Sequence, residues 1–275
     1  MTVSVKRQFV EGAFGQLHTR FAVPEQANRP AIICLHMSPK SGRLFAEVMP
    51  YLAQDRRVLA PDYPGHGESD IPPPSPHVTI EDFAQALWTV ADHFDTGPVH
   101  LVGHHTGAMV AVEAASQRPN QVLSVVNIGA PVFTAEEQVR LTQDYEPLAI
   151  DESGNRFQIM WQRVLEHRGP GMTLAMAATS FSENLRAGDH YEWGHRAAFA
   201  YSPTYNQRLT ELDHPVLVMN PADDCFEQSK RADAMLKRGR RIDYPQWGHG
   251  FLSAYPEQAA AEILKFAQDV ECGDA

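Results

Sequence analysis

The sequence contains few cysteines, no long apolar run and no leader-like N-terminus. Three cysteines occur in 275 residues, odd in number and widely spaced, which fits neither a disulfide framework nor a zinc ribbon. No stretch approaches the roughly 18 consecutive apolar residues that a membrane-spanning helix needs. No apolar run follows the charged N-terminal residues, as one would in a signal peptide. We therefore expect a soluble, cytoplasmic protein that does not contact a membrane.

Positive charge is also scarce, because the formal net charge is −11 at pH 7. Nucleic-acid-binding surfaces need basic stripes. The nearest basic cluster, residues 237–241, is more simply a solvated helix end. We expect no nucleic-acid partner. A hydrophobic fraction of 43% with 21% charged residues instead indicates a globular protein with a full core.

Short apolar runs alternate with amphipathic ones along most of the chain. Residues 4–23 alternate apolar and polar, which predicts an antiparallel edge hairpin. Apolar runs too short for helices predict buried strands at 31–35, 58–60, 99–102, 122–128, 216–219 and 242–244. Helical patterns occur at 44–52, 80–94, 107–117 and 257–270, the second opened by a capping box of Thr79 and Asp82. The alternation predicts a mostly parallel sheet covered by helices on both faces.

This alternation stops between residues 133 and 212. No good strand pattern occurs there, whereas helical patterns carry many methionines and aromatic residues. The simplest interpretation is that most of these side chains pack a small core of the segment's own, although they could also form an adaptable wall over a pocket. We therefore expect a core of residues 1–132 and 213–275, with residues 133–212 inserted after the sixth strand as a helical cap.

Residues 101–108 have the pattern of a strand, a sharp turn and a helix. Gly103 and Gly107 flank His105 in this stretch. Small residues at the flanking positions permit a tight turn that lifts the middle side chain above the sheet, which is the pattern of a nucleophile elbow. The middle residue of such an elbow is ordinarily serine, cysteine or aspartate. Here it is histidine.

Four motifs resemble those of the α/β-hydrolase superfamily and occur in the order that its fold imposes. They are a D-x-x-G-x-G-x-S loop, an elbow, an acid-bearing strand end and a histidine loop, at residues 62–69, 103–107, 217–223 and 247–250. The resemblance covers the chain except the cap and implies the α/β-hydrolase fold. It also implies that His249 is the general base and that Asp223 orients it, with Asp224 as the rival one residue away.

The resemblance further implies an oxyanion hole made of backbone amides. One donor is Thr106, which follows the elbow residue, and the other comes from the loop after the first buried parallel strand, where Ser38 is the expected donor. This chain has Met37 where the family normally has glycine. Because backbone amides do this work, the turn matters more than the side chains.

His105 leaves several chemistries open. As a nucleophile, its imidazole would form an acyl-imidazole that water hydrolyses readily. As a base, it would work with His249 to remove a proton or activate water, and the two rings would titrate as a coupled pair. His105, His249 and Asp223 could instead bind zinc, although the family's acid normally stands behind the histidine. Loss of catalysis would leave a pocket that only binds a ligand.

We expect an enzyme that hydrolyses a small, largely apolar ester, amide or lactone, with no cofactor and no resident metal. His105 would be the nucleophile or base, His249 the general acid/base and Asp223 its orienting carboxylate. The alternatives are a non-hydrolytic lyase or cofactor-free oxygenase that uses both histidines for proton abstraction, or an inactive ligand-binding member. We expect His104 to support the elbow, and Cys225 has no adjacent base in the sequence.

Overall fold

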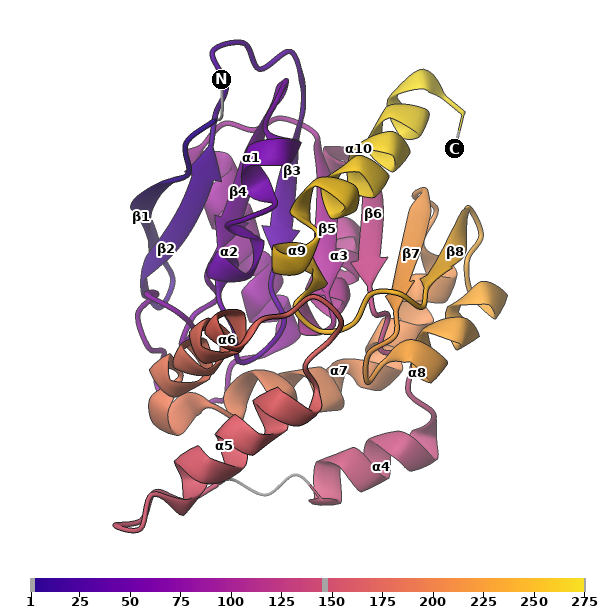
Figure 1. Cartoon of the computed structure of the whole chain (residues 1–275). Helices are drawn as coiled ribbons and strands as arrows, with labels where there is room; N and C mark the ends of the chain where they lie inside the picture. The colour runs from indigo at the N-terminus through magenta and orange to yellow at the C-terminus, as the bar shows by residue number, and fades with distance from the viewer. Residues whose placement is uncertain (1–2, 145–147, 275) are drawn as a thin grey trace.

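An eight-stranded sheet is the centre of the fold. The computed structural model describes residues 3–144 and 148–274, and its strands follow the order β1-β2-β4-β3-β5-β6-β7-β8 (Figure 1). β1 (Lys6–Gly12) and β2 (Gly15–Ala22) form the predicted antiparallel hairpin, and β2 joins β4 antiparallel. The remaining strands pair in parallel: β3 (Arg29–Leu35), β4 (Arg56–Pro61), β5 (Val99–His104), β6 (Val122–Ile128), β7 (Val216–Pro221) and β8 (Gly239–Tyr244).

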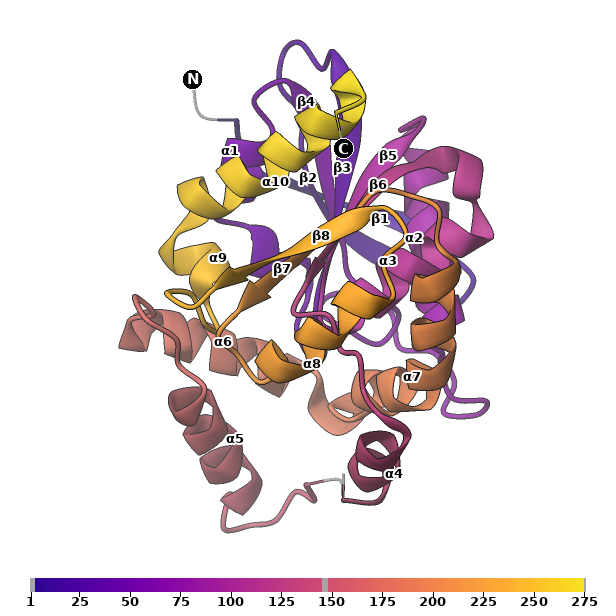
Figure 2. The same cartoon turned by 90° about the vertical axis from the view of Figure 1, so that its right-hand side faces the viewer.

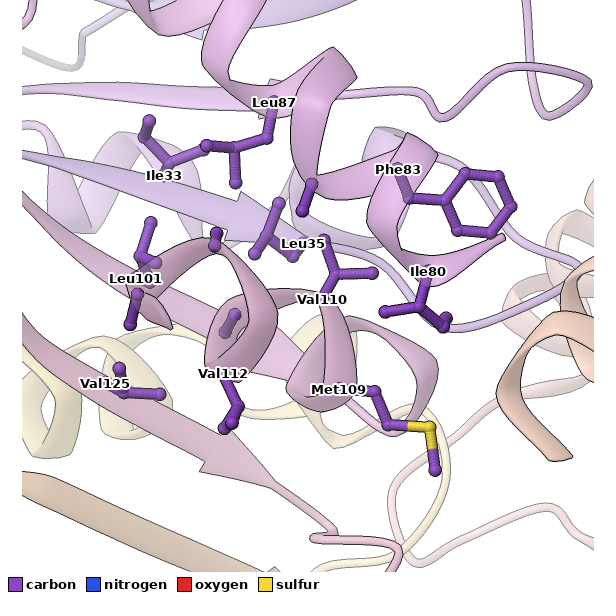
Figure 3. Close-up of a cluster of buried hydrophobic side chains, with 14 of the residues drawn as sticks. Ile33, Leu35, Ile80, Phe83, Leu87, Leu101, Met109, Val110, Val112 and Val125 are labelled. Atoms are coloured by element: carbon purple, nitrogen blue, oxygen red, sulfur yellow. The ribbon is translucent and has the colours of Figure 1, made fainter. Parts of the chain in front are cut away.

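Helices cover both faces of the sheet, as predicted (Figure 2). The core helices are α1 (Met49–Leu52), α2 (Ile80–His93), α3 (Thr106–Gln117), α8 (Phe226–Lys230), α9 (Phe251–Ala254) and α10 (Pro256–Cys272). Ile33 and Leu35 of β3 pack with side chains of α2 and α3 (Figure 3). Ile32 and Cys34 pack on the opposite face with α1, α9 and α10. Continuous apolar strands are therefore buried on both sides.

The segment after β3 differs from the prediction. The single helix expected over 44–52 is wrong, because the chain forms a 3-10 helix, Gly42–Phe45, and then the short α1. Pro50 lies in the first turn of α1. Proline has no amide hydrogen, so Pro50 cannot bond back to the preceding turn and is suited to the first turn of a new helix. The capping box of α2 is present, with the Thr79 amide donating to Asp82 Oδ2 at 2.9 Å.

A helical insert follows β6. It consists of α4 (Ala135–Asp144), α5 (Asn155–Glu166), α6 (Leu174–Arg186) and α7 (Trp193–Glu211). These helices lie across the end of the sheet toward which β6 points (Figure 1). Met160 and Tyr191 belong to a small core of the insert itself, whereas Tyr205 and Leu209 of α7 join the main core. Residues 145–147 lie outside the described part of the chain.

The loop at residues 62–69 is a structural support. The Asp62 carboxylate accepts the backbone amides of Gly42 and Glu68 at 2.7 and 2.9 Å, and it lies 2.9 Å from His18 Nδ1. These bonds fix the start of the 3-10 helix against the end of β4, so this motif shapes the edge of the site.

Within the described residues, no helix has both the length and the apolar character needed to cross a bilayer.

Candidate active site

A strained turn joins β5 to α3 at the elbow. His105 has φ 48° and ψ −107°, a conformation that a β-carbon disfavours and that costs on the order of 1–3 kcal/mol. A Cβ at Gly103 would overlap the carbonyl of Gly107, and a Cβ at Gly107 would overlap the carbonyl of Leu35. Close backbone approach therefore requires both glycines, and the turn places His105 at the end of the sheet that the cap covers.

The His105 ring is directed toward the end of β7. Its Nε2 lies 2.9 Å from Asp223 Oδ2 and 3.9 Å from Asp224 Oδ1. The other Asp223 oxygen accepts the backbone amide of Cys225 at 2.9 Å. Gly129, just beyond β6, makes room for the ring, because a Cβ there would overlap it. The Asp223 carboxylate is thus held on one side by a backbone amide and on the other by the elbow imidazole.

His249 has a carboxylate partner of its own. Its Nε2 lies 2.7 Å from Asp224 Oδ1, and its ring is perpendicular to that of His105, with the centroids 5.6 Å apart. The expected pairing of His249 with Asp223 is therefore corrected to a pairing with Asp224. The reason is size: an imidazole at position 105 reaches Asp223 and occupies the oxygen that a small elbow residue would leave to His249.

The two pairs differ in burial and in charge. The side chains of His105 and Asp223 are 10% and 0% exposed, against 17% and 53% for His249 and Asp224. Burial by itself would lower the pKa of His105, but its interactions with Cys225, Asp223 and Asp224 outweigh this effect and hold that pKa well above its ordinary value. Burial raises the pKa of the Cys225 thiol, so the carboxylates are the charges that act near neutral pH.

The carboxylates respond in the opposite direction. Burial disfavours the ionised form of Asp223, yet the positive His105 beside it lowers the pKa of that carboxyl overall. The pKa of Asp224 is lowered for the same reasons, despite the opposing effect of burial. His105 and Asp223 therefore form a buried ion pair at neutral pH.

His104 is a site residue whose position the sequence does not reveal. It is 2% exposed, and among the described residues neither of its ring nitrogens has a hydrogen-bond partner. Its Nε2 lies 3.8 Å from Asp223 Oδ2. Burial lowers the pKa of His104 to about 4, so its ring is neutral at pH 7. An unpartnered buried polar group costs about 1–3 kcal/mol, so the burial of this ring is a cost that the elbow bears.

The structure brings the two expected oxyanion donors into contact. The Ser38 amide donates to Thr106 Oγ1 at 3.4 Å, and Ser38 Oγ lies 3.3 Å from His66 Nε2. Helix α7 packs closely over this loop, because a Cβ at Gly194 would overlap Ser38 Oγ. The Ser38 amide is free to donate to a substrate oxygen only when it no longer donates to the Thr106 hydroxyl. His66 is a neighbour of Ser38 that the sequence analysis missed.

The cap holds the His249 loop in place. The Gly169 amide, between α5 and α6, donates to the His249 carbonyl at 3.1 Å. The His167 ring lies edge to face with the His249 ring, their centroids 5.6 Å apart. A Cβ at Gly169 would overlap the same carbonyl, so glycine is required for this approach. The position of His249 is therefore coupled to that of the cap.

The order of strands, the elbow and the histidine loop agree with a comparison of the sequence with known families. The model of the alpha/beta hydrolase fold family matches residues 30–252. The chain belongs to the α/β-hydrolase fold family. This assignment rests on most of the chain and covers the elbow, both carboxylates and His249.

Individual relatives of this α/β-hydrolase-fold protein have varied names. The magnesium-chelatase 30 kDa subunit of Rhodobacter capsulatus is 33% identical over 104 residues, which covers 38% of this chain and 36% of that protein. The chain thus spans about a third of that relative's length in this match. A non-heme chloroperoxidase of Streptomyces lividans is 28% identical over 244 residues, covering 79% of this chain and 84% of that protein.

Solved structures share the fold at low sequence identity. An esterase (EaEST) from Exiguobacterium antarcticum superposes with a TM-score of 0.78 at 17% identity, over 96% of this chain and 100% of that one. At such identity the likeness shows the α/β-hydrolase fold alone. The residues that indicate the activity of this chain are the two imidazole–carboxylate pairs, His105–Asp223 and His249–Asp224.

Proposed function

We propose that this protein hydrolyses a small, largely apolar ester or related carbonyl compound. The observation that carries the proposal is the pair of facing imidazoles, His105 and His249, each bonded to its own carboxylate at 2.9 and 2.7 Å. One imidazole can take a proton while a cationic one stabilises negative charge, and ester hydrolysis needs both operations.

His249 is the proposed general base. It lies nearer to solvent than His105, and Asp224 fixes its orientation through Nε2. It removes a proton from a water molecule, whose oxygen forms a bond to the carbonyl carbon while the carbonyl electron pair moves onto oxygen. Histidine suits this role because an imidazole can both accept and donate a proton. When the intermediate collapses, the bond to the leaving oxygen breaks and His249 returns the proton to that oxygen.

His105 acts in this proposal through its positive charge. A nucleophile needs a free lone pair, but Cys225 and the carboxylates of Asp223 and Asp224 raise the pKa of His105, which favours the protonated ring. The imidazolium instead lies near the developing oxyanion, together with the amide at Thr106. We therefore favour direct attack by water over an acyl-imidazole, so the products are a carboxylic acid and an alcohol.

The cap and the structures of the same fold favour an apolar ester as the substrate. Met172 of the α5–α6 connection packs against the His249 loop, close enough that its side chain would overlap a Cβ at Gly250. A methionine beside the base favours an apolar acyl or alkyl group. The esterase among the structures of the same fold is consistent with an ester substrate.

The test is hydrolysis of short-chain p-nitrophenyl esters, with rapid-quench mass spectrometry of the protein. We expect turnover by the wild type, severe loss in His249→Ala and no acyl adduct at any time point. An acyl group on His105 would overturn the water-attack order. A wild-type rate no faster than that of His249→Ala, across esters, amides and lactones, would overturn the hydrolase assignment.

Proton abstraction without hydrolysis is the second candidate. It is favoured by the match to a non-heme chloroperoxidase over 79% of this chain and by the histidine at the elbow. In a lyase or a cofactor-free oxygenase, His249 would remove a proton from carbon and His105 would stabilise the resulting anion. Exchange of substrate C–H protons with deuterated water, without ester cleavage, would favour this candidate over hydrolysis.

A further inference from the structure

At the elbow, three potential metal ligands lie close together, two of them residues of the proposed reaction site. They are Nε2 of His104, Nε2 of His105 and Oδ2 of Asp223. The Asp223 oxygen lies 3.8 Å from the first nitrogen and 2.9 Å from the second, and metal-ligand atoms of the three residues lie within 4.8 Å of one another. His104 and His105 lie at the end of β5, and Asp223 lies in the turn after β7. The ends of these two strands therefore bring the ligands together.

The spacing suits a tetrahedral transition-metal ion. Zinc bonds to histidine nitrogen and carboxylate oxygen at about 2.0–2.2 Å. Two ligands of a tetrahedral ion are then about 3.3–3.6 Å apart, and the two observed separations from Asp223 Oδ2, 2.9 and 3.8 Å, bracket this range. Side-chain shifts of about half an ångström would bring both separations into the range, and ligand atoms of the two histidines lie within 4.8 Å of each other.

The unpartnered His104 ring is an independent indication of a ligand. His104 is 2% exposed, its Nε2 is directed at Asp223, and in the described part of the chain no group hydrogen-bonds to either of its nitrogens. His100, four residues earlier on the same strand, contrasts with it. Both of its nitrogens have partners, Ser124 Oγ at 2.7 Å and Glu271 Oε1 at 3.1 Å.

The carboxylate is oriented as a metal ligand would be. Asp223 Oδ1 accepts the backbone amide of Cys225 at 2.9 Å, which leaves Oδ2 for the two histidines. Hydrogen bonds of this kind orient the ligands of known metal sites. Asp224 Oδ1, 3.9 Å from His105 Nε2, lies on the open side, where a fourth ligand or a water molecule would bind.

We propose that His104, His105 and Asp223 form a binding site for one zinc-class transition-metal ion. Two imidazoles and one carboxylate select such ions over magnesium and calcium, which prefer oxygen ligands. The ion would occupy the place of the proton between His105 and Asp223, so the metal-bound form and the imidazolium form used in the proposed hydrolysis exclude each other. The inference goes beyond the proposed hydrolysis, because binding is measured without substrate and without turnover.

The experiment is a titration of chelator-treated protein with zinc chloride by calorimetry, with cobalt chloride followed by visible absorption and magnesium chloride as the comparison. We expect one zinc or cobalt ion per chain at micromolar concentration or below, d–d absorption typical of nitrogen and oxygen ligands, and no binding of magnesium. Absence of saturable zinc binding by the folded wild type would overturn the proposal, as would a thiolate-to-cobalt charge-transfer band, which would place the ion on Cys225.

Variants locate the ion. We expect His104→Gln and Asp223→Asn each to weaken zinc binding at least about tenfold, whereas His100→Gln, a substitution of a buried histidine on the same strand, leaves it unchanged. Circular dichroism and thermal melting check that each variant is folded. If His104→Gln does not fold, the zinc affinity of Asp223→Asn and the cobalt spectrum of the wild type still show whether the ion binds at this site. Unchanged affinity in folded His104→Gln, or loss in His249→Gln alone, would place the ion elsewhere and overturn the proposal.

Discussion

Two imidazole–carboxylate pairs lie side by side in this molecule, one buried and one at the rim. His105–Asp223 and His249–Asp224 use the same chemical groups at similar separations, 2.9 and 2.7 Å. The Asp223 side chain is fully buried, whereas the Asp224 side chain is 53% exposed. Burial strengthens the interaction of charges, and water screens it. The buried pair is therefore suited to hold a fixed charge and the rim pair to exchange protons with water.

The comparison also explains why the elbow tolerates a histidine. A side chain lifted by the strained turn would be exposed to the substrate if it were short. The His105 ring instead extends past Gly129 to the end of β7, where it contacts the Asp223 carboxylate rather than solvent. The reactive position moves outward, to His249, and the elbow supplies positive charge.

The largest effect is expected when the rim imidazole is removed. His249→Ala eliminates the proposed base and should reduce kcat for an aryl ester by about 10²–10⁴-fold. The matched control is His167→Ala, which removes the ring that packs edge to face on His249 without touching a carboxylate partner. It should retain most of the activity. Equal loss in both variants would assign the effect to loop packing, and a near wild-type rate in His249→Ala would refute its role as base.

Removing the buried carboxylate should change the pH dependence. The protonated form of His105 is the active one, so the rate should fall as pH rises through its raised pKa. Asp223→Asn removes a charge that raises this pKa, so the fall should begin at lower pH, with kcat at pH 8 reduced about 10–100-fold. The measurement is kcat against pH. A decline at the same pH in both proteins would contradict the cationic role of His105.

Stability should also depend on pH through this pair. Because the folded-state pKa of His105 is raised, its contribution to stability is present below the ordinary histidine pKa and is lost as pH rises through the raised value. Because the pKa of Asp223 is lowered, its contribution is present above the ordinary aspartate pKa and is lost as pH falls through the lowered value. Melting temperature against pH should therefore decline less steeply at both ends in Asp223→Asn.

Displacing the buried ring by packing should have an intermediate effect. Gly129→Ala places a methyl group in the space of the His105 ring, at a residue with φ 62°. We expect a loss of about 1–3 kcal/mol in the free energy of unfolding and a partial loss of activity. Gly97→Ala is the control, because Gly97 has φ 65° but nothing within 4 Å of an added Cβ. Equal destabilisation in the two variants would show that the ring does not occupy the predicted place.

The smallest effect is expected at the rim carboxylate. Asp224→Asn removes a charge that water already screens, and the amide oxygen can still accept a hydrogen bond from His249. We expect kcat to fall less than about tenfold. Rates measured in low and high salt should differ less in Asp224→Asn than in the wild type. A loss as large as that in His249→Ala would show that the rim pair is as strongly coupled as the buried one.

The fold was predictable because its signals are local. The apolar runs, the capping box at Thr79 and the two glycines of the elbow each depend on neighbouring residues, and the order of the motifs then fixes the topology. The prediction of a single helix over 44–52 was wrong, because Pro50 interrupts the helix that the spacing of apolar residues suggests. Roles within the site depend on contacts between distant segments, and periodicity carries no information about them.

The pairing of carboxylates shows this limit most clearly. Asp223 and Asp224 are adjacent, so the motif spacing alone favoured Asp223 as the partner of His249. The structure reverses the pairing because the elbow imidazole is long enough to take Asp223 first. The unpartnered state of His104 and the position of Cys225 beside Asp223 likewise follow from how β5 and β7 end next to the same turn.

The charge of the elbow imidazole can be measured by NMR titration of labelled histidine side chains in chelator-treated, metal-free protein. The resonance that disappears in His105→Gln should remain that of an imidazolium at pH 8, and it should lose its proton at lower pH in Asp223→Asn. If the His105 ring instead loses its proton at or below the ordinary histidine pKa of about 6.5, the buried pair carries no fixed charge and the division of roles between the two imidazoles is wrong.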